Sequence, residues 1–211
     1  MRNVNERICC DKRKLTLTVH EHNEHDHHDH GPMPTSGQGL NGVALDATLH
    51  CLTGCAIGEI VGMIIATAAG LSNGASIAIS VVLAFFFGYS LTSLPLLRAG
   101  LALAAIVPIA LASDTFSIAL MEVADNAIIA AIPDALDAGL GDVLFWGSLA
   151  FSLAVAGVAA FPLNRWLIAR GKGHTAVHNT GIHGGPSPRI VGAIAVAAFV
   201  FGAVVLVADA T

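Results

Sequence analysis

Five long apolar stretches constrain the fold of this chain more than any other feature of its sequence. They cover residues 48–71, 75–97, 99–132, 143–168 and 190–208. A helix needs about 20 mainly apolar residues to cross a bilayer, and all five stretches are of that order or longer. Turn-forming or charged residues separate them, among them Asn73, Arg98 and Pro133. The sequence therefore predicts an all-α fold, a polytopic membrane bundle of about five transmembrane helices.

Composition excludes the main alternatives to such a bundle. Hydrophobic residues make up 55% of the chain and charged residues 12%, against about 25% charged residues in an ordinary soluble domain. This balance excludes a disordered protein, a nucleic-acid binder and a typical cytosolic enzyme. The stretches also lack the alternating pattern of membrane strands. We therefore expect membrane lipids around the chain and no nucleic acid as a partner.

Two local features refine the expected helices. Asp46 precedes the first stretch and is placed to cap its amino end. The third stretch would be about 50 Å long as one helix, against a hydrocarbon core of roughly 30 Å. It must therefore tilt, kink at Pro108 or project beyond the bilayer.

The amino-terminal region differs sharply from the rest of the chain. Residues 1–31 hold 11 of the 25 charged side chains and six of the ten histidines. We expect residues 1–45 to form a polar, largely disordered tail and residues 46–211 to form the transmembrane domain. The tail histidines alternate with carboxylates, a composition typical of metal binding. The predicted metal-capture residues are His20, His22, His25, His27, His28 and His30. An expression tag is the alternative, although tags are usually unbroken histidine runs.

Basic residues predict the orientation of the bundle. Arg98 follows the second stretch, and Arg165, Arg170, Lys172 and Arg189 surround the connection between the fourth and fifth. The connection between the third and fourth is acidic instead. Because basic connections stay on the cytoplasmic side, five spans place the amino terminus inside. We expect a multi-pass protein of the bacterial inner membrane.

Metal-binding side chains recur every four residues in the first stretch. Cys51, Cys55, Glu59 and Met63 follow this spacing, and His50 precedes them. Residues four apart lie along one slowly turning helix face. Thiolate, carboxylate and thioether groups in line predict successive ligands for a metal ion. The alternative for the cysteines is that they fill space as small apolar side chains.

Glycines repeat at the same spacing on the neighbouring face of this stretch, at Gly54, Gly58 and Gly62. Small residues four apart let another helix approach closely. We therefore expect a second helix to pack tightly against this face.

The third stretch carries the other polar residues expected inside the bilayer. A charge at that depth costs at least about 2.5 kcal/mol, so each is a functional hypothesis. We predict that Asp114 and Glu122 bind metal, with Ser117 and Asn126 as possible additions. Asp114 and Glu59, if near one depth, would share a cation or a proton. A purely structural Asp114, hydrogen-bonded to hydroxyl groups, is the alternative, and Asp125 is expected to be solvated near the outer interface.

Two histidines follow the fourth stretch. His174 and His178 have the spacing of one helical turn, so they could bind metal if that segment is helical. The alternative is a solvated loop. Tyr89, Thr92 and their neighbours precede Pro95, and we interpret these hydroxyl groups as packing around a kink.

Three segments of the chain resemble a known family. They are the Leu49–Glu59 run, the Asp114–Glu122 segment, and the Phe145–Leu149 run with the string from Pro162 through Asn164 and Trp166 to His174. Together they are similar to a bacterial membrane family, domain of unknown function 4396, over roughly residues 45–178. The family label gives no reaction, and the resemblance implies an association with copper and heavy-metal handling.

The predicted function is an inner-membrane transporter for a transition metal of the copper or zinc class, with coupling to protons left open. Cysteines and Met63 favour Cu(I), whereas histidines and carboxylates favour Zn(II). The metal ion is the substrate, no organic cofactor is expected, and a homo-oligomer is the expected assembly. The alternatives are an accessory or metal-storage subunit and an intramembrane redox enzyme. No protease or haem-attachment motif supports an enzyme.

Overall fold

The computed structural model describes residue 34 and residues 36–181 and 187–210. These residues form five long helices and one short helix and contain no strand. The helices are α1 (Gly37–Ala69), α2 (Asn73–Arg98), α3 (Leu103–Ala131), α4 (Val143–Ala169), α5 (Thr175–His178) and α6 (Pro188–Ala210). All but α5 are long and apolar enough to cross a membrane. The predicted all-α bundle with five spans is therefore confirmed, while the tail histidines lie outside the described residues.

The first helix begins earlier than its hydropathy indicates. Helix α1 starts at Gly37, with Ser36 at the capping position, although the apolar stretch begins only at Thr48. The expectation that Asp46 caps this helix was wrong. Asp46 lies inside α1 instead, and its Oδ1 atom is 2.9 Å from Nε of Arg189 at the start of α6. The first turns of α1 are helical but contain too many polar residues to appear in a hydropathy pattern.

Helix α3 continues through Pro108 from Leu103 to Ala131. Pro108 is the sixth residue of this helix, so it lacks the backbone N–H that would bond to the carbonyl of Ala104, and the helix continues without that hydrogen bond. Helix α4 begins with a side-chain cap, because Asp142 accepts a hydrogen bond of 2.8 Å from the backbone nitrogen of Leu144.

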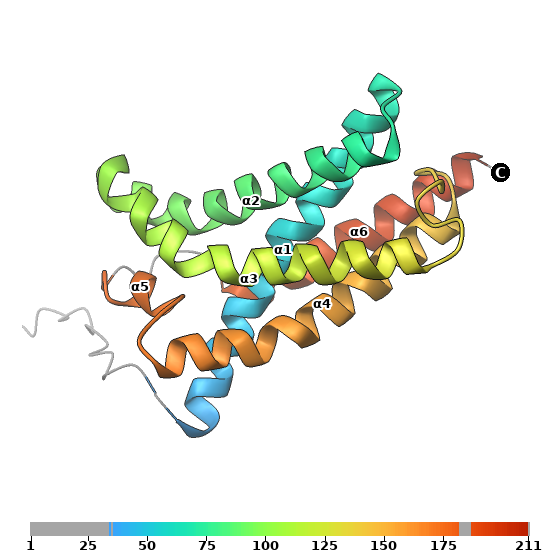
Figure 1. Cartoon of the computed structure of the whole chain (residues 1–211). Coiled ribbons are helices and arrows are strands. Elements are labelled where there is room, and N and C mark those ends of the chain that lie inside the picture. Colours follow the sequence, from blue (N-terminus) through green and yellow to red (C-terminus); the bar gives the residue numbers. More distant parts are fainter. Residues whose placement is uncertain (1–33, 35, 182–186, 211) are drawn as a thin grey trace, which may run out of the picture. The chain divides into compact units, whose positions relative to one another are not determined.

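The alternation of the helices gives the bundle two ends (Figure 1). We call the end with the α2–α3 and α4–α6 connections the basic end, since it carries Arg98, Arg170 and Lys172. The end with the α1–α2 and α3–α4 connections is the acidic end. There, the Asn73 amide donates a hydrogen bond of 2.8 Å to Asp137, which ties the two connections together.

Helix α1 contacts α2, α3, α4 and α6 and is the centre of the bundle. Its glycine face packs closely against another helix, as the sequence predicts, and that helix is α2. A Cβ atom on Gly54 would lie 2.7 Å from Cα of Gly88, and one on Gly58 would meet the backbone of Ala84. Only glycine permits this close approach of two backbones.

Helix α3 shows how the bundle divides apolar and polar side chains. Its outer face exposes Val107, Phe116 and Val123, which suits lipid contact. Its inner face buries five polar residues, namely Ser113, Asp114, Ser117, Glu122 and Asp125. The polar residues therefore face the other helices.

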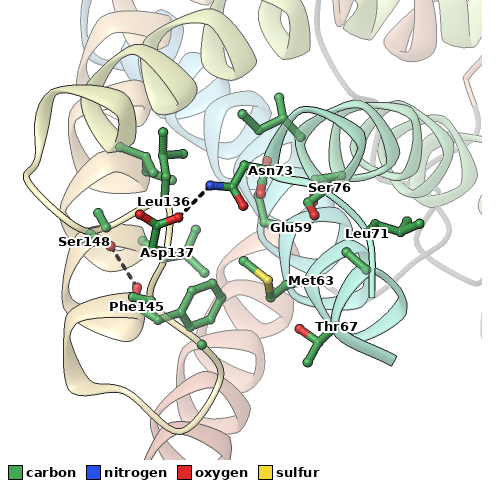
Figure 2. A pocket seen from close by; sticks show the side chains of 18 of the residues that line it. Glu59, Met63, Thr67, Leu71, Asn73, Ser76, Leu136, Asp137, Phe145 and Ser148 are labelled. Atoms are coloured by element: carbon green, nitrogen blue, oxygen red, sulfur yellow. Dashed lines mark hydrogen bonds between the residues drawn. The ribbon is translucent and has the colours of Figure 1, made fainter. Parts of the chain in front are cut away.

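A cavity of about 310 Å³ opens at the acidic end (Figure 2). Glu59 and Met63 of α1 line it together with Ser80, Asn126 and Asp137. Glu59, which lines the cavity, also lies next to the buried acids Glu122 and Asp125 of α3.

Candidate metal centre

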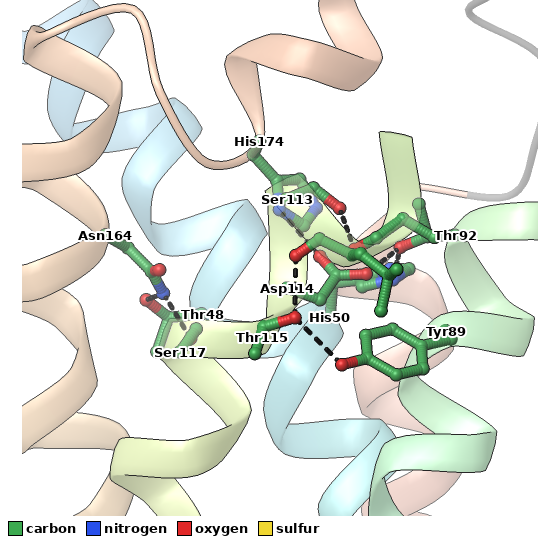
Figure 3. Close-up of polar contacts among 12 residues, drawn as sticks. Thr48, His50, Tyr89, Thr92, Ser113, Asp114, Thr115, Ser117, Asn164 and His174 are labelled. Atoms are coloured by element: carbon green, nitrogen blue, oxygen red, sulfur yellow. Dashed lines mark hydrogen bonds and ion pairs between the residues drawn. The ribbon is translucent and has the colours of Figure 1, made fainter. Parts of the chain in front are cut away.

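Three potential metal ligands from distant parts of the chain meet near the basic end (Figure 3). His50 comes from α1, Asp114 from α3, and His174 from the segment between α4 and α5. One donor atom from each lies within 4.8 Å of the other two. Nδ1 of His174 is 3.2 Å from Oδ1 of Asp114, and the two imidazole centroids are 5.2 Å apart. We call these three residues the His₂Asp group.

Thr92 of α2 holds two members of this group in place. Its hydroxyl donates a hydrogen bond of 2.5 Å to Oδ2 of Asp114. The same hydroxyl oxygen is 2.8 Å from Nε2 of His50. Such outer partners fix the orientation of metal ligands. Thr92 therefore positions the site, although the sequence suggested only packing for it.

Glycine conformations bring His174 over the bundle. Helix α4 ends at Ala169, and Gly171 and Gly173 follow with φ angles of 68° and 61°. These left-handed conformations are favourable for glycine and strained for most other residues. They reverse the chain after α4, so that the imidazole of His174 reaches Asp114. The side chains of His174 and Asp114 are 14% and 0% exposed.

The protonation state of His174 suits a metal ligand. Burial and, to a smaller extent, the nearby charge of His178 together lower the pKa of His174 to about 4. The imidazole is therefore neutral at neutral pH and keeps a lone pair for a metal ion. His174 groups with His50 and Asp114, and the use of His178 as a further ligand stays a prediction.

Polar side chains continue from the His₂Asp group into the bundle. Cys51 is fully buried beside the hydroxyl of Ser117. The amide of Asn164 donates hydrogen bonds of 3.0 Å to Ser117 and 2.9 Å to Thr48. Asn164 thus joins α4 to α1 and α3. Its only sequence signal is its place in the Pro162–His174 string.

A second group of potential ligands lies deeper, between the His₂Asp group and the cavity. Glu122 of α3 is next to Cys55 and Glu59 of α1. Asp125 follows one turn later and accepts a hydrogen bond of 2.5 Å from Ser152 of α4. Cys55, Glu122 and Asp125 are 1%, 4% and 1% exposed. We call Glu59, Glu122 and Asp125 the carboxylate cluster.

Two expectations about these acids were wrong. Asp125 is buried rather than solvated at an interface, because Ser152 and the surrounding helices enclose it. Glu59 lies next to Glu122 and Asp125 rather than sharing a cation with Asp114. The reason is the register of the helices: α1 and α3 run in the same direction, so that residue 50 faces 114 and residue 59 faces 125.

Residues 50–63 of α1 therefore contact polar groups at successive depths. His50 and Cys51 lie with Asp114 and Ser117, and Cys55 lies beside Glu122. Met63 lines the cavity, as does Asn126, whose amide donates a hydrogen bond of 2.9 Å to the carbonyl of Glu122. The arrangement offers a cation ligands from near the basic end to the cavity at the acidic end.

Comparison with known proteins gives one match. The family model described as Domain of unknown function (DUF4396) matches residues 42–173. The matched segment contains His50, Asp114 and the carboxylate cluster and ends one residue before His174. No curated protein and no solved structure matches the chain.

Proposed function

We propose a function for this chain as a member of the DUF4396 family, to which it belongs because the family model matches more than half of its length. The chain is a membrane transporter for a divalent transition metal of the zinc class. The family description names no reaction, so the proposal depends on the residues of the chain itself.

The His₂Asp group is the observation that carries the proposal. Two imidazoles and one carboxylate are ligands that suit Zn(II) and similar divalent ions, whereas Cu(I) prefers thiolate and thioether sulfur. The three donor atoms come from three separate segments and still lie within 4.8 Å of one another. Buried charged groups are costly in a membrane protein and usually mark an ion pathway or binding site.

The position of the group supports transport rather than storage. It lies near the basic end, and further polar groups extend from it to the cavity at the acidic end. A storage site would not require ligands at several depths of the bundle. The cysteines and Met63 remain predicted ligands along this path.

Orientation and assembly complete the proposal. By the positive-inside rule the basic end faces the cytoplasm of a bacterial inner membrane. The tail histidines remain the residues proposed for metal capture. A homo-oligomer is the proposed assembly, because a chain of 21.6 kDa gives a single bundle only a thin wall around an ion pathway.

An intramembrane redox enzyme is the second candidate, because the ligands of the His₂Asp group also suit a redox-active metal. Two histidines and one carboxylate also hold Fe(II) in oxygen-activating enzymes that contain no haem. Such an enzyme would retain iron through purification and consume oxygen, whereas a zinc transporter would do neither.

Flux into liposomes tests the proposed function. The full chain is reconstituted, and uptake of Zn²⁺ and Cu(I) is measured with ion-sensitive dyes against empty liposomes. We expect Zn²⁺ flux that exceeds Cu(I) flux and that Cys51→Ser reduces without abolishing it. Zn²⁺ flux no greater than that of empty liposomes would contradict transport, and Cu(I) flux that requires Cys51 and Cys55 would reassign the cargo.

A further inference from the structure

We propose that the carboxylate cluster and Cys55 form a second divalent-cation site, which receives a partly hydrated ion from the cavity at the acidic end. As a binding site it is independent of the His₂Asp group. As a position on the pathway of the transported ion it rests on the proposed function.

The charge balance of this region calls for a cation. Glu59, Glu122 and Asp125 bring three carboxyl groups together from two helices. Helices α1 and α3 contain no lysine or arginine. The basic residues of α2 and α4, Arg98 and Arg165, lie at the opposite end of the bundle. Burying several carboxylates without a counter-charge is unfavourable, so the cluster must hold either a cation or protons.

Unpartnered oxygen atoms show where a cation would bind. Glu122 is only 4% exposed, and both of its carboxylate oxygens are buried without a hydrogen-bond partner. Oε1 of Glu59 and Oδ2 of Asp125 are also buried and unpartnered. Buried polar atoms are nearly always satisfied in native proteins, by the protein, water or an ion. Four such oxygens in one cluster point to a ligand.

The spacing of the donor atoms favours an ion that keeps some of its water. Among the described residues, only the His₂Asp group brings three donor atoms within 4.8 Å of one another. The carboxylate cluster is therefore wider. Carboxylate sites commonly bind divalent ions through a few oxygens while waters complete the shell. The cavity beside Glu59 has room for that water, and the thiol of Cys55 adds a ligand that zinc accepts.

The two sites then differ in chemistry as well as depth. A hydrated ion enters from the cavity, binds first to oxygen ligands and exchanges its remaining water for imidazoles at the His₂Asp group. In the opposite direction the order reverses. The carboxylate cluster thus selects for charge, and the His₂Asp group selects for a transition metal.

Counting bound Zn²⁺ tests the second site. The full chain in detergent is dialysed to equilibrium with Zn²⁺ at neutral pH, and bound zinc is measured per chain. The tail is present in every variant, so its contribution cancels when variants are compared. We expect the Glu122→Gln/Asp125→Asn variant to bind one Zn²⁺ fewer than the wild type. Asp134→Asn/Asp142→Asn is the matched control, since it changes two acids outside the cluster and should lose none.

Three further variants separate the possible failures. His50→Ala/His174→Ala should also lose one Zn²⁺, and the four substitutions combined should lose two. The histidine variant could lose no Zn²⁺ while the carboxylate variant loses one. That result would contradict the His₂Asp site on which the proposed function depends, and it would support the second site. If the Glu122→Gln/Asp125→Asn variant also loses the Zn²⁺ bound at the His₂Asp group, the substitutions have distorted the bundle. In that case Glu59→Gln alone, at the cavity edge, should lower the affinity of the second site about tenfold.

Proton binding is the outcome that would overturn the inference. In that case Glu122→Gln/Asp125→Asn and Glu59→Gln would bind as much Zn²⁺ as the wild type with unchanged affinity. A pH-indicator titration would then show that these variants differ from the wild type only in the number of protons bound.

Discussion

Thr92 shows how much of the proposed metal centre depends on residues that would not touch the metal. It comes from α2, and its hydroxyl contacts both Asp114 of α3 and His50 of α1. Three helices therefore share one hydrogen-bonded unit. Such partners typically change metal affinity by about 10–100-fold when they are removed.

Replacing Thr92 by valine keeps the shape of the side chain and removes the hydroxyl. We expect Thr92→Val to weaken Zn²⁺ binding at the His₂Asp group about 10–100-fold, because Asp114 and His50 lose their common partner. Ser90→Ala is the control, since the Ser90 hydroxyl bonds only to the carbonyl of Phe86 in its own helix. Titration with a competing zinc indicator measures both. Equal affinities in the two variants would contradict the role of Thr92.

His174 is the proposed ligand that the sequence identifies least clearly, and its removal should have a larger effect than Thr92→Val. We expect His174→Ala to lower zinc affinity at this group by more than Thr92→Val, because a direct ligand is lost. His178→Ala, four residues away and outside the group, should change the affinity far less. The same indicator titration compares them. A larger loss in His178→Ala would favour the pairing expected from sequence spacing.

Single residues also show the limits of prediction from sequence. His50, Asp114, Glu59 and Glu122 stand out because charged or metal-binding groups are rare inside spans. Their partners do not, because contact between residues 50 and 174 depends on helix register and on two left-handed glycines after α4. Asp125 was misjudged for the same reason: its burial depends on Ser152 of another helix.

At the scale of elements, the contact between α1 and α2 supports the whole arrangement. Gly54 and Gly58 let α2 approach α1 closely, and Thr92 of α2 thereby reaches the His₂Asp group. Glycine spacing predicted this contact. Hydropathy located the five spans within a few residues, except at α1, where the polar first turns carry no hydropathy signal.

Gly54→Ala tests the close contact between these helices. The added methyl group would lie 2.7 Å from Cα of Gly88, so α2 must move away. We expect a loss of about 1–3 kcal/mol in the free energy of unfolding. Gly42→Ala is the matched control in the same helix, because nothing lies within 4 Å of its new Cβ. Alanine should be neutral or stabilising there by up to about 1 kcal/mol.

Thermal unfolding in detergent, followed by circular dichroism, compares the two glycine variants. Gly54→Ala should unfold at a lower temperature than the wild type, and Gly42→Ala should not. If both variants unfold at the wild-type temperature, the two backbones are not in close contact.

The whole molecule has a charge asymmetry that predicts its orientation. Lys172 lies at the basic end and Asp134 at the acidic end, and both are exposed. Lys172→Cys and Asp134→Cys are made with Cys9 and Cys10 replaced by serine. A membrane-impermeant maleimide should label Asp134→Cys on intact spheroplasts and Lys172→Cys only after permeabilisation. The opposite labelling would place the His₂Asp group near the outer face.

Zinc flux through an Asp114 variant tests the central claim most directly. Asp114→Asn keeps the shape of the side chain and the acceptor for Thr92 while removing the charge that would hold the metal. In proteoliposomes with equal amounts of folded protein, we predict that Asp114→Asn lowers the initial rate of Zn²⁺ uptake at least tenfold, whereas Asp134→Asn leaves it unchanged. Wild-type uptake by Asp114→Asn would contradict the assignment of the His₂Asp group as the transport site.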